Sequence, residues 1–130
     1  MENYGKELII DLHQCDASRF NRQHLRAFCK ILCDAIGMKR GTFADGKNAL
    51  VFWDDIGVPK KYKQTEEHTK GTSAIQFILT SNITIHTLDL MKRVYINIFS
   101  CKDFDADAAA RLTQDFFGGQ IIKSTVIDRI

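Results

Sequence analysis

The stretch TSNITIHT, residues 80–87, predicts the β-strand around which this fold is built. Two isoleucines alternate in it with a threonine and a histidine, which is typical of a strand with one buried face. The pattern predicts a strand at 82–88, and further strands are predicted at 73–80 and 93–100. The links between these three strands have the length of β-hairpin connections, so we expect antiparallel pairing.

Two helices are predicted from apolar residues that recur at helical spacing. The first should end at Gly37, and the second should begin after Asp105 and end before Gly118. The predicted helices lie at 21–36 and 105–117, and three further strands are expected at 7–12, 49–53 and 120–127. The charged segment 54–72 is expected to be a long loop.

The order of these elements predicts a single α/β domain over residues 1–130, folded as a two-layer sandwich. The sheet is expected to be largely antiparallel, with both helices on one face, because the strands are joined by short links and each helix lies near one end of the chain. The other face of such a sheet is left uncovered. We therefore expect a homodimer.

The composition excludes several classes of protein. A hydrophobic fraction of 45% and a charged fraction of 26% are typical of a globular domain. The net charge of +2 gives no reason to expect a nucleic-acid partner. No apolar segment is long enough for a signal peptide or a membrane span, so we expect a cytoplasmic protein without a membrane partner. The four cysteines are expected as thiols, and Cys29 and Cys33 as core residues, so no metal site is predicted.

Four segments of the chain carry a resemblance to a known family. They are GKELIIDLHQCD (5–16), GTS (71–73), TSNITIHT (80–87) and INIFSCKDFD (96–105). In order and spacing they resemble the prokaryotic S-adenosylmethionine decarboxylases, and the resemblance covers most of the chain except 38–70. It implies the fold of that family and a decarboxylase of polyamine biosynthesis, in the branch that leads to spermidine.

The resemblance implies that the chain cuts itself between Thr80 and Ser81. Ser81 would become a pyruvoyl cofactor, which binds the substrate amine as a Schiff base and draws electrons from the carboxylate-bearing carbon. The processing serine and histidine of the family correspond to Ser73 and His86, and its proton donor to Cys101. Because one reacting centre requires all of them, we expect these four side chains to line one pocket. His86 lies five positions after Ser81, so in a regular strand the two side chains would be on opposite faces, and this expectation requires a turn or bulge near Ser81.

The predicted substrate site departs from the family pattern. A glutamate that holds the ribose of the substrate in the family is replaced here by Leu90, and an aromatic residue that stacks on adenine falls in the charged run 66–68. Glu66, Glu67 or Asp89 could instead pair with the cationic end of a basic amino acid, since a carboxylate facing ammonium or guanidinium is a charge-assisted contact. We predict these three acids and Asp11 as substrate-binding residues.

Three functions follow from these observations. The first is a pyruvoyl-dependent S-adenosylmethionine decarboxylase, and the second is the same chemistry on a basic amino acid such as ornithine or arginine. The third is an unprocessed homologue that binds a ligand or partner without catalysis. The first two functions require a cut chain and a small-molecule substrate, whereas the third leaves the chain intact.

Overall fold

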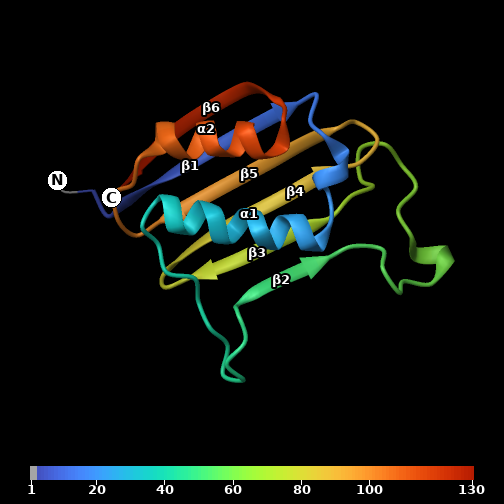
Figure 1. The fold of residues 1–130 in the computed structure, drawn as a ribbon, viewed down its shortest axis with the longest axis horizontal. Helices are drawn as coiled ribbons and strands as arrows, with labels where there is room; N and C mark the ends of the chain where they lie inside the picture. The colour runs from blue at the N-terminus through green and yellow to red at the C-terminus, as the bar shows by residue number, and fades with distance from the viewer. Residues whose placement is uncertain (1–2) are drawn as a thin grey trace.

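The computed structural model describes residues 3–130, which form one sheet with two helices on one of its faces (Figure 1). The six strands are β1 (Gly5–His13), β2 (Leu50–Trp53), β3 (Ser73–Ile78), β4 (Ser81–Leu88), β5 (Arg93–Ser100) and β6 (Gln120–Arg129). The helices are α1 (Arg22–Ala35) and α2 (Ala106–Phe117), and two short 3-10 turns lie at Ala17–Arg19 and Lys60–Tyr62. The strand order is β2-β3-β4-β5-β1-β6, and every neighbouring pair is antiparallel. The predicted two-layer α/β sandwich is confirmed.

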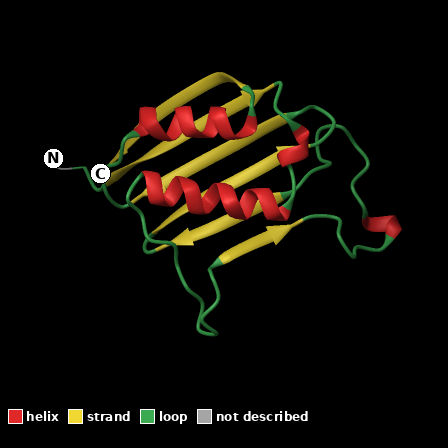
Figure 2. Cartoon of the chain, viewed as in Figure 1, coloured by secondary structure: helices red, strands yellow, loops and turns green. Residues whose placement is uncertain are grey.

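The two ends of the sheet carry different connections. Figure 2 shows the helices in one layer and the strands in the other. The turn between β3 and β4 lies at the same end of the sheet as the start of β1 and the end of β6, and the loop between β2 and β3 lies at the opposite end (Figure 1). Residues at the start of β4 and residues just after its end are therefore on opposite sides of the molecule.

Capping side chains set the ends of the helices. The side-chain oxygen of Asn21 accepts a hydrogen bond from the backbone N–H of His24 at 3.0 Å and starts α1. Asp105 accepts in the same way from Ala108 at 3.0 Å and starts α2. The second helix ends at Gly118, whose φ of 65° lies in the left-handed region that favours glycine. The predicted limits of this helix, Asp105 and Gly118, are confirmed.

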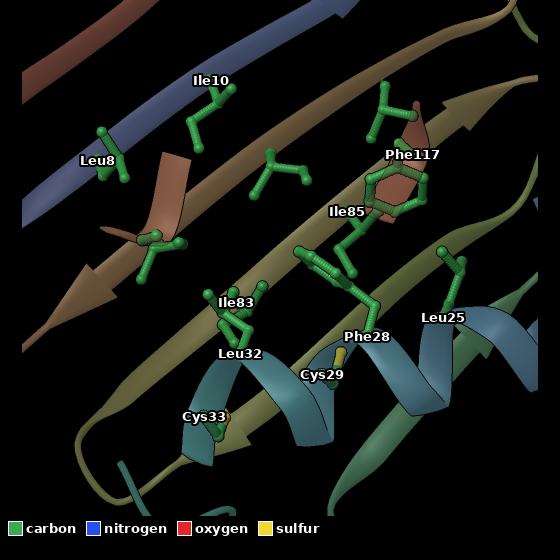
Figure 3. Close-up of a cluster of buried hydrophobic side chains, with 14 of the residues drawn as sticks. Leu8, Ile10, Leu25, Phe28, Cys29, Leu32, Cys33, Ile83, Ile85 and Phe117 are labelled. Atoms are coloured by element: carbon green, nitrogen blue, oxygen red, sulfur yellow. The ribbon is translucent and has the colours of Figure 1, made fainter. Parts of the chain in front are cut away.

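The core lies between the helices and the alternate residues of the central strands (Figure 3). Phe28 of α1 is fully buried, and its ring packs against Phe116 and Phe117 of α2 at centroid distances of 5.2 Å and 4.9 Å. Cys29 and Cys33 are buried free thiols, as predicted. The strands contribute fully buried aliphatic side chains, among them Leu8, Ile10, Ile83, Ile85 and Ile98.

The turn between β3 and β4 differs from the prediction. The predicted strand 73–80 ends at Ile78, and the strand predicted to start at residue 82 starts at Ser81. The connection is a two-residue tip, Leu79–Thr80, and Ile78 pairs directly with Ser81. Thr80 has a φ of 53°, and this single left-handed residue lets the chain reverse within two residues.

The face of the sheet opposite the helices, called the open face below, carries partly exposed apolar side chains. Trp53, Ile75 and Phe77 lie on it at one edge, and Ile127 lies at the other. No element in residues 3–130 covers this face. Within the same residues, no helix is long and apolar enough to cross a membrane, and no cluster of metal-ligating side chains is present.

Replacing Phe28 tests the described core. Phe28→Ala should lower the free energy of unfolding by about 3–5 kcal/mol, because it removes a fully buried ring and leaves a cavity. Ile31→Ala is the matched control on the same helix, since Ile31 is 46% exposed and its truncation should cost about 0.5 kcal/mol or less. Urea unfolding measures both. Equal losses would contradict the orientation of α1.

Candidate functional site

Ser81 lies at one end of the sheet, directly after the exposed tip Leu79–Thr80. Its side chain is buried, and Ser81 Oγ accepts a hydrogen bond from the backbone N–H of Cys101 at 2.9 Å. Thr80 is β-branched, and its φ of 53° is a conformation that costs such a residue about 1–3 kcal/mol. The Thr80–Ser81 peptide bond thus joins a strained residue to a fixed hydroxyl. This arrangement suits attack of the hydroxyl on the carbonyl carbon just before it.

Cys101 is the thiol in the described residues that is best suited to proton transfer. Hydrogen bonds from the Thr80 and Ser81 side chains lower the pKa of the Cys101 thiol. The other three cysteines are buried, and burial raises their pKa values to about 11 or about 12. Cys101 therefore exchanges its proton closer to neutral pH than they do.

Ser81 and Cys101 line a cavity of about 270 Å³. The other side chains that line it are three apolar groups and two lysines: Met38, Ile78, Leu79, Lys39 and Lys102. Pockets that enclose a drug-sized ligand measure roughly 300–1,000 Å³. The cavity of one chain therefore has room for the reacting part of a substrate and for little more.

Ser73 and His86 form a second group, on the open face. They are directly paired residues of β3 and β4, and Ser73 Oγ and His86 Nδ1 are hydrogen-bonded at 2.8 Å. His86 also lines a cavity of about 210 Å³ together with Asp11 and Asn97. The side-chain oxygen of Asn97 is buried and has no hydrogen-bond partner within residues 3–130. The open face therefore contains a hollow that brings together an acid, a base and an unsatisfied acceptor.

The prediction that four catalytic side chains line one pocket is wrong within a single chain. β4 pairs with β5 in one register from Asn82 to Leu88, so no bulge reverses the alternation of its side chains. Ser81 therefore lies on the helix-covered face and His86 on the open face. The five steps from Ser81 to His86 also place them roughly 16 Å apart along the strand. The structure brings together two pairs, Ser81 with Cys101 and Ser73 with His86.

The family model of S-adenosylmethionine decarboxylase matches residues 52–130, which make up more than half of the chain and include both pairs of side chains. The chain belongs to the S-adenosylmethionine decarboxylase family. No curated protein gives a significant match to the sequence. Family membership supports an enzyme of the decarboxylase class that acts on a small molecule.

In this member of the S-adenosylmethionine decarboxylase family, three predicted substrate-binding acids lie at the opposite end of the sheet from Ser81. Asp89 directly follows β4, roughly 26 Å along the strand from Ser81. Burial raises the pKa of the Asp89 carboxyl, and one of its oxygens has no hydrogen-bond partner in the described part of the chain. Glu66 and Glu67 are exposed in the loop between β2 and β3. None of these acids reaches a substrate bound at Ser81 of the same chain.

Three cations near Ser81 were missed in the sequence. Lys39 and Lys102 line the 270 Å³ cavity, and Arg40 lies with Lys39 in an adjoining cavity of about 570 Å³. Lys102 directly follows Cys101, so its position in the sequence was a usable signal. Lys39 and Arg40 come from the segment that the family resemblance does not cover, and only the fold brings them to the tip.

Alkylation tests the environment of Cys101. In a His86→Ala background, whose intact mass is checked first, Cys101 should react with iodoacetamide at lower pH than any other cysteine. Its midpoint should lie below that of an unperturbed cysteine, because a lowered pKa produces thiolate at lower pH. Adding Ser81→Ala should raise this midpoint, since it removes one hydroxyl that stabilises the thiolate.

Peptide mass mapping across a pH series measures these rates, with buried Cys15 as the reference thiol. A midpoint for Cys101 equal to that of Cys15 would contradict the described site.

Proposed function

We propose that this chain is a pyruvoyl-dependent decarboxylase of polyamine biosynthesis that forms its own cofactor by cutting itself between Thr80 and Ser81. The observation that carries the proposal is the fixed Ser81 hydroxyl beside a strained peptide. The Cys101 N–H holds Ser81 Oγ at 2.9 Å, and cleavage releases Thr80 from its unfavourable φ of 53°. The residues present therefore fit formation of a pyruvoyl group at this position.

Self-cleavage needs only groups of the protein and one water molecule. Ser81 Oγ attacks the carbonyl carbon of Thr80, the C–N bond breaks, and an ester forms while the nitrogen of Ser81 takes up the hydroxyl proton. A base then removes the Cα proton of Ser81, and the Cβ–O bond breaks, which releases Thr80 as a carboxylate. The remaining double bond rearranges to an imine. Water adds to it and ammonia leaves, so that residue 81 becomes a pyruvoyl group.

In this proposal a second copy of the chain supplies the base. Ser73 and His86 lie on the open face, far from Ser81 of their own chain. A two-fold axis that lies between two open faces and runs across the strands places the His86 end of one sheet over the Ser81 end of the other. The dimer also covers exposed apolar side chains such as Trp53 and Phe77. The exposed tip makes the peptide bond before Ser81 accessible from the end of the sheet.

The hydrogen bond between Ser73 and His86 suits His86 to the role of the base. It links Ser73 Oγ to His86 Nδ1 at 2.8 Å, which fixes the plane of the imidazole ring. The other ring nitrogen, Nε2, is then free to exchange a proton with a neighbouring chain. Ser73 acts through His86 in this arrangement and is a positioning residue.

The decarboxylation step uses the cavity beside Ser81. A pyruvoyl group supplies an electron sink for the carboxylate-bearing carbon of an amine-containing substrate. After carbon dioxide leaves, that carbon needs a proton, and we assign its donation to Cys101 Sγ, whose pKa is lowered beside Ser81. The buried side chains of Met38 and Ile78 limit the access of water to the reacting carbon.

One observation favours a basic amino acid as a second candidate for the substrate. Leu90 occupies the position of the ribose-binding glutamate, and its side chain has no group that can accept a hydrogen bond. Neighbouring Asp89 has a buried carboxylate oxygen with no partner in residues 3–130. In the proposed dimer this end of the sheet approaches the partner's Ser81. Asp89 could then pair with an ammonium or guanidinium group of the substrate.

Self-cleavage has a direct test. Purified wild-type protein should contain two fragments, one that ends at Thr80 and one that begins with a pyruvoyl group at position 81. Ser81→Ala should stay intact, because alanine has no hydroxyl to attack the carbonyl. Intact-mass measurement separates these outcomes. A wild-type chain that stays whole after long incubation would favour the non-catalytic homologue that binds a ligand or partner.

Mixing two uncut variants extends this test to the shared site. Ser81→Ala and His86→Ala should each stay intact alone. When the two are co-expressed, the His86→Ala chain should be cut, because its Ser81 faces His86 of the partner subunit. The control pairs His86→Ala with the double variant Ser81→Ala/His86→Ala and should show no cut. Absence of cleavage in the first mixture would contradict the exchange of residues between chains.

The substrate is tested at Leu90. Each ribose hydroxyl buried without a partner costs about 1–3 kcal/mol, or roughly ten- to a hundredfold in affinity. Leu90→Glu should therefore raise kcat/KM for S-adenosylmethionine by at least about tenfold and should not raise it for ornithine or arginine. Release of carbon dioxide measures all three, with Ile122→Glu on the exposed β6 edge as the charge control. Efficient turnover of S-adenosylmethionine by the wild type, unchanged in Leu90→Glu, would show that position 90 does not bind ribose.

A further inference from the structure

The charged side chains that line the two cavities at the tip Leu79–Thr80 are all cations. The 270 Å³ cavity at the tip is lined by Lys39 and Lys102, and the adjoining 570 Å³ cavity by Lys39 and Arg40. No aspartate or glutamate is among the residues that line these two cavities. The peptide bond after Thr80 therefore lies in a positive environment.

These three cations have no acidic partner within residues 3–130. Nearby, Lys6 is paired with Asp103 at 2.7 Å. Lys102 Nζ donates instead to the backbone oxygen of Gly37 at 2.8 Å, which holds its charge at the first cavity. Arg40 is half-buried, and burying part of a guanidinium group without a counter-ion is unfavourable. The site therefore has a surplus of positive charge that an anion would neutralise.

Self-cleavage creates an anion at this place. Before the cut, the carbonyl of Thr80 belongs to a neutral peptide bond. When the ester is broken by elimination, Thr80 becomes a C-terminal carboxylate. Two residues beyond Ile78 allow this new terminus to move by roughly 7 Å, which is enough to turn toward either cavity.

We propose that Lys39, Arg40 and Lys102 bind the new C-terminal carboxylate of Thr80. The inference rests on the proposed function, because this carboxylate exists only in a cut chain. Binding draws the tip away from the start of β4 and opens the group at position 81 to the substrate. It also keeps the carboxylate from adding back to the double bond from which it was released.

The carboxylate of the substrate is the competing ligand for these cations, and the chemistry disfavours it. A carboxylate that leaves as carbon dioxide loses its negative charge in the transition state. Cations around it would stabilise the starting state more than the transition state and would slow the reaction. The carboxylate of Thr80 keeps its charge throughout, so the same cations bind it without this penalty.

Carboxypeptidase digestion of the cut protein measures whether the terminus is held. Thr80 and Leu79 should be removed slowly from the N-terminal fragment of the wild type. Lys39→Gln/Lys102→Gln should be trimmed about two- to thirtyfold faster, the effect of losing two exposed ion pairs. High salt should bring the wild-type rate toward that of the variant. Intact mass follows the fragment over time.

Two further variants keep the result specific. Lys60→Gln/Lys61→Gln removes the same charge from the loop at the other end of the sheet and should be trimmed like the wild type. Lys39→Arg/Lys102→Arg should keep the protection. Equal rates of trimming in the wild type and in Lys39→Gln/Lys102→Gln would overturn the carboxylate site. If that variant also showed a raised KM for the substrate, the cations would be assigned to substrate binding instead. A wild-type chain that is never cut would overturn the proposed function itself, and this site with it.

Discussion

Side chains of a β-strand alternate between its two faces, and this period of two governs where chemistry can occur in the chain. β4 begins at Ser81 directly after a two-residue tip, so its first side chain lies on the side of the helices while His86 lies on the open face. Hydrogen bonds to β3 and β5 on both sides fix this register. The ladder that holds the sheet together therefore also separates a reacting serine from its base.

The two faces of the sheet differ in what they leave unsatisfied. On the helix side, Phe28 and the aliphatic side chains opposite it form a closed core. On the open face, the buried amide oxygen of Asn97 lacks a partner in the described residues, and it lies beside Asp11 in a hollow bordered by apolar groups. Such an oxygen is costly until a ligand or another chain donates to it. One face thus provides stability, and the other is suited to association.

Local signals in the sequence account for most of the fold. Alternation marked the strands, and Asp105 and Gly118 marked the limits of α2, because each acts on its own backbone neighbours. The tip was misplaced because its reversal depends on one φ value at Thr80, and threonine is not a residue that predicts such a turn. Buried Gln76 could not be anticipated either, since its amide is satisfied by Asn48, 28 residues earlier in the chain, with Nε2 and Oδ1 2.9 Å apart.

In the candidate site, too, some features could be predicted from the sequence and others depend on contacts between distant segments. The residue types and spacings of the two pairs were visible in the sequence, because motifs preserve them. The alternation of side chains along a strand already predicted that Ser81 and His86 lie on different faces. The expectation of one pocket within one chain did not follow that pattern. The proximity of Lys39 and Arg40 to the tip could not be predicted, because it depends on a β-bridge between Arg40 and Ile78, a contact between distant segments.

The uncovered sheet face has a consequence for when activity arises. If each site is built from two chains, maturation is second order in the concentration of the protein. A newly made chain then stays whole until it meets another, and the waiting time shortens as more chains accumulate. The uncovered face thereby couples the onset of activity to the amount of protein that has been synthesised.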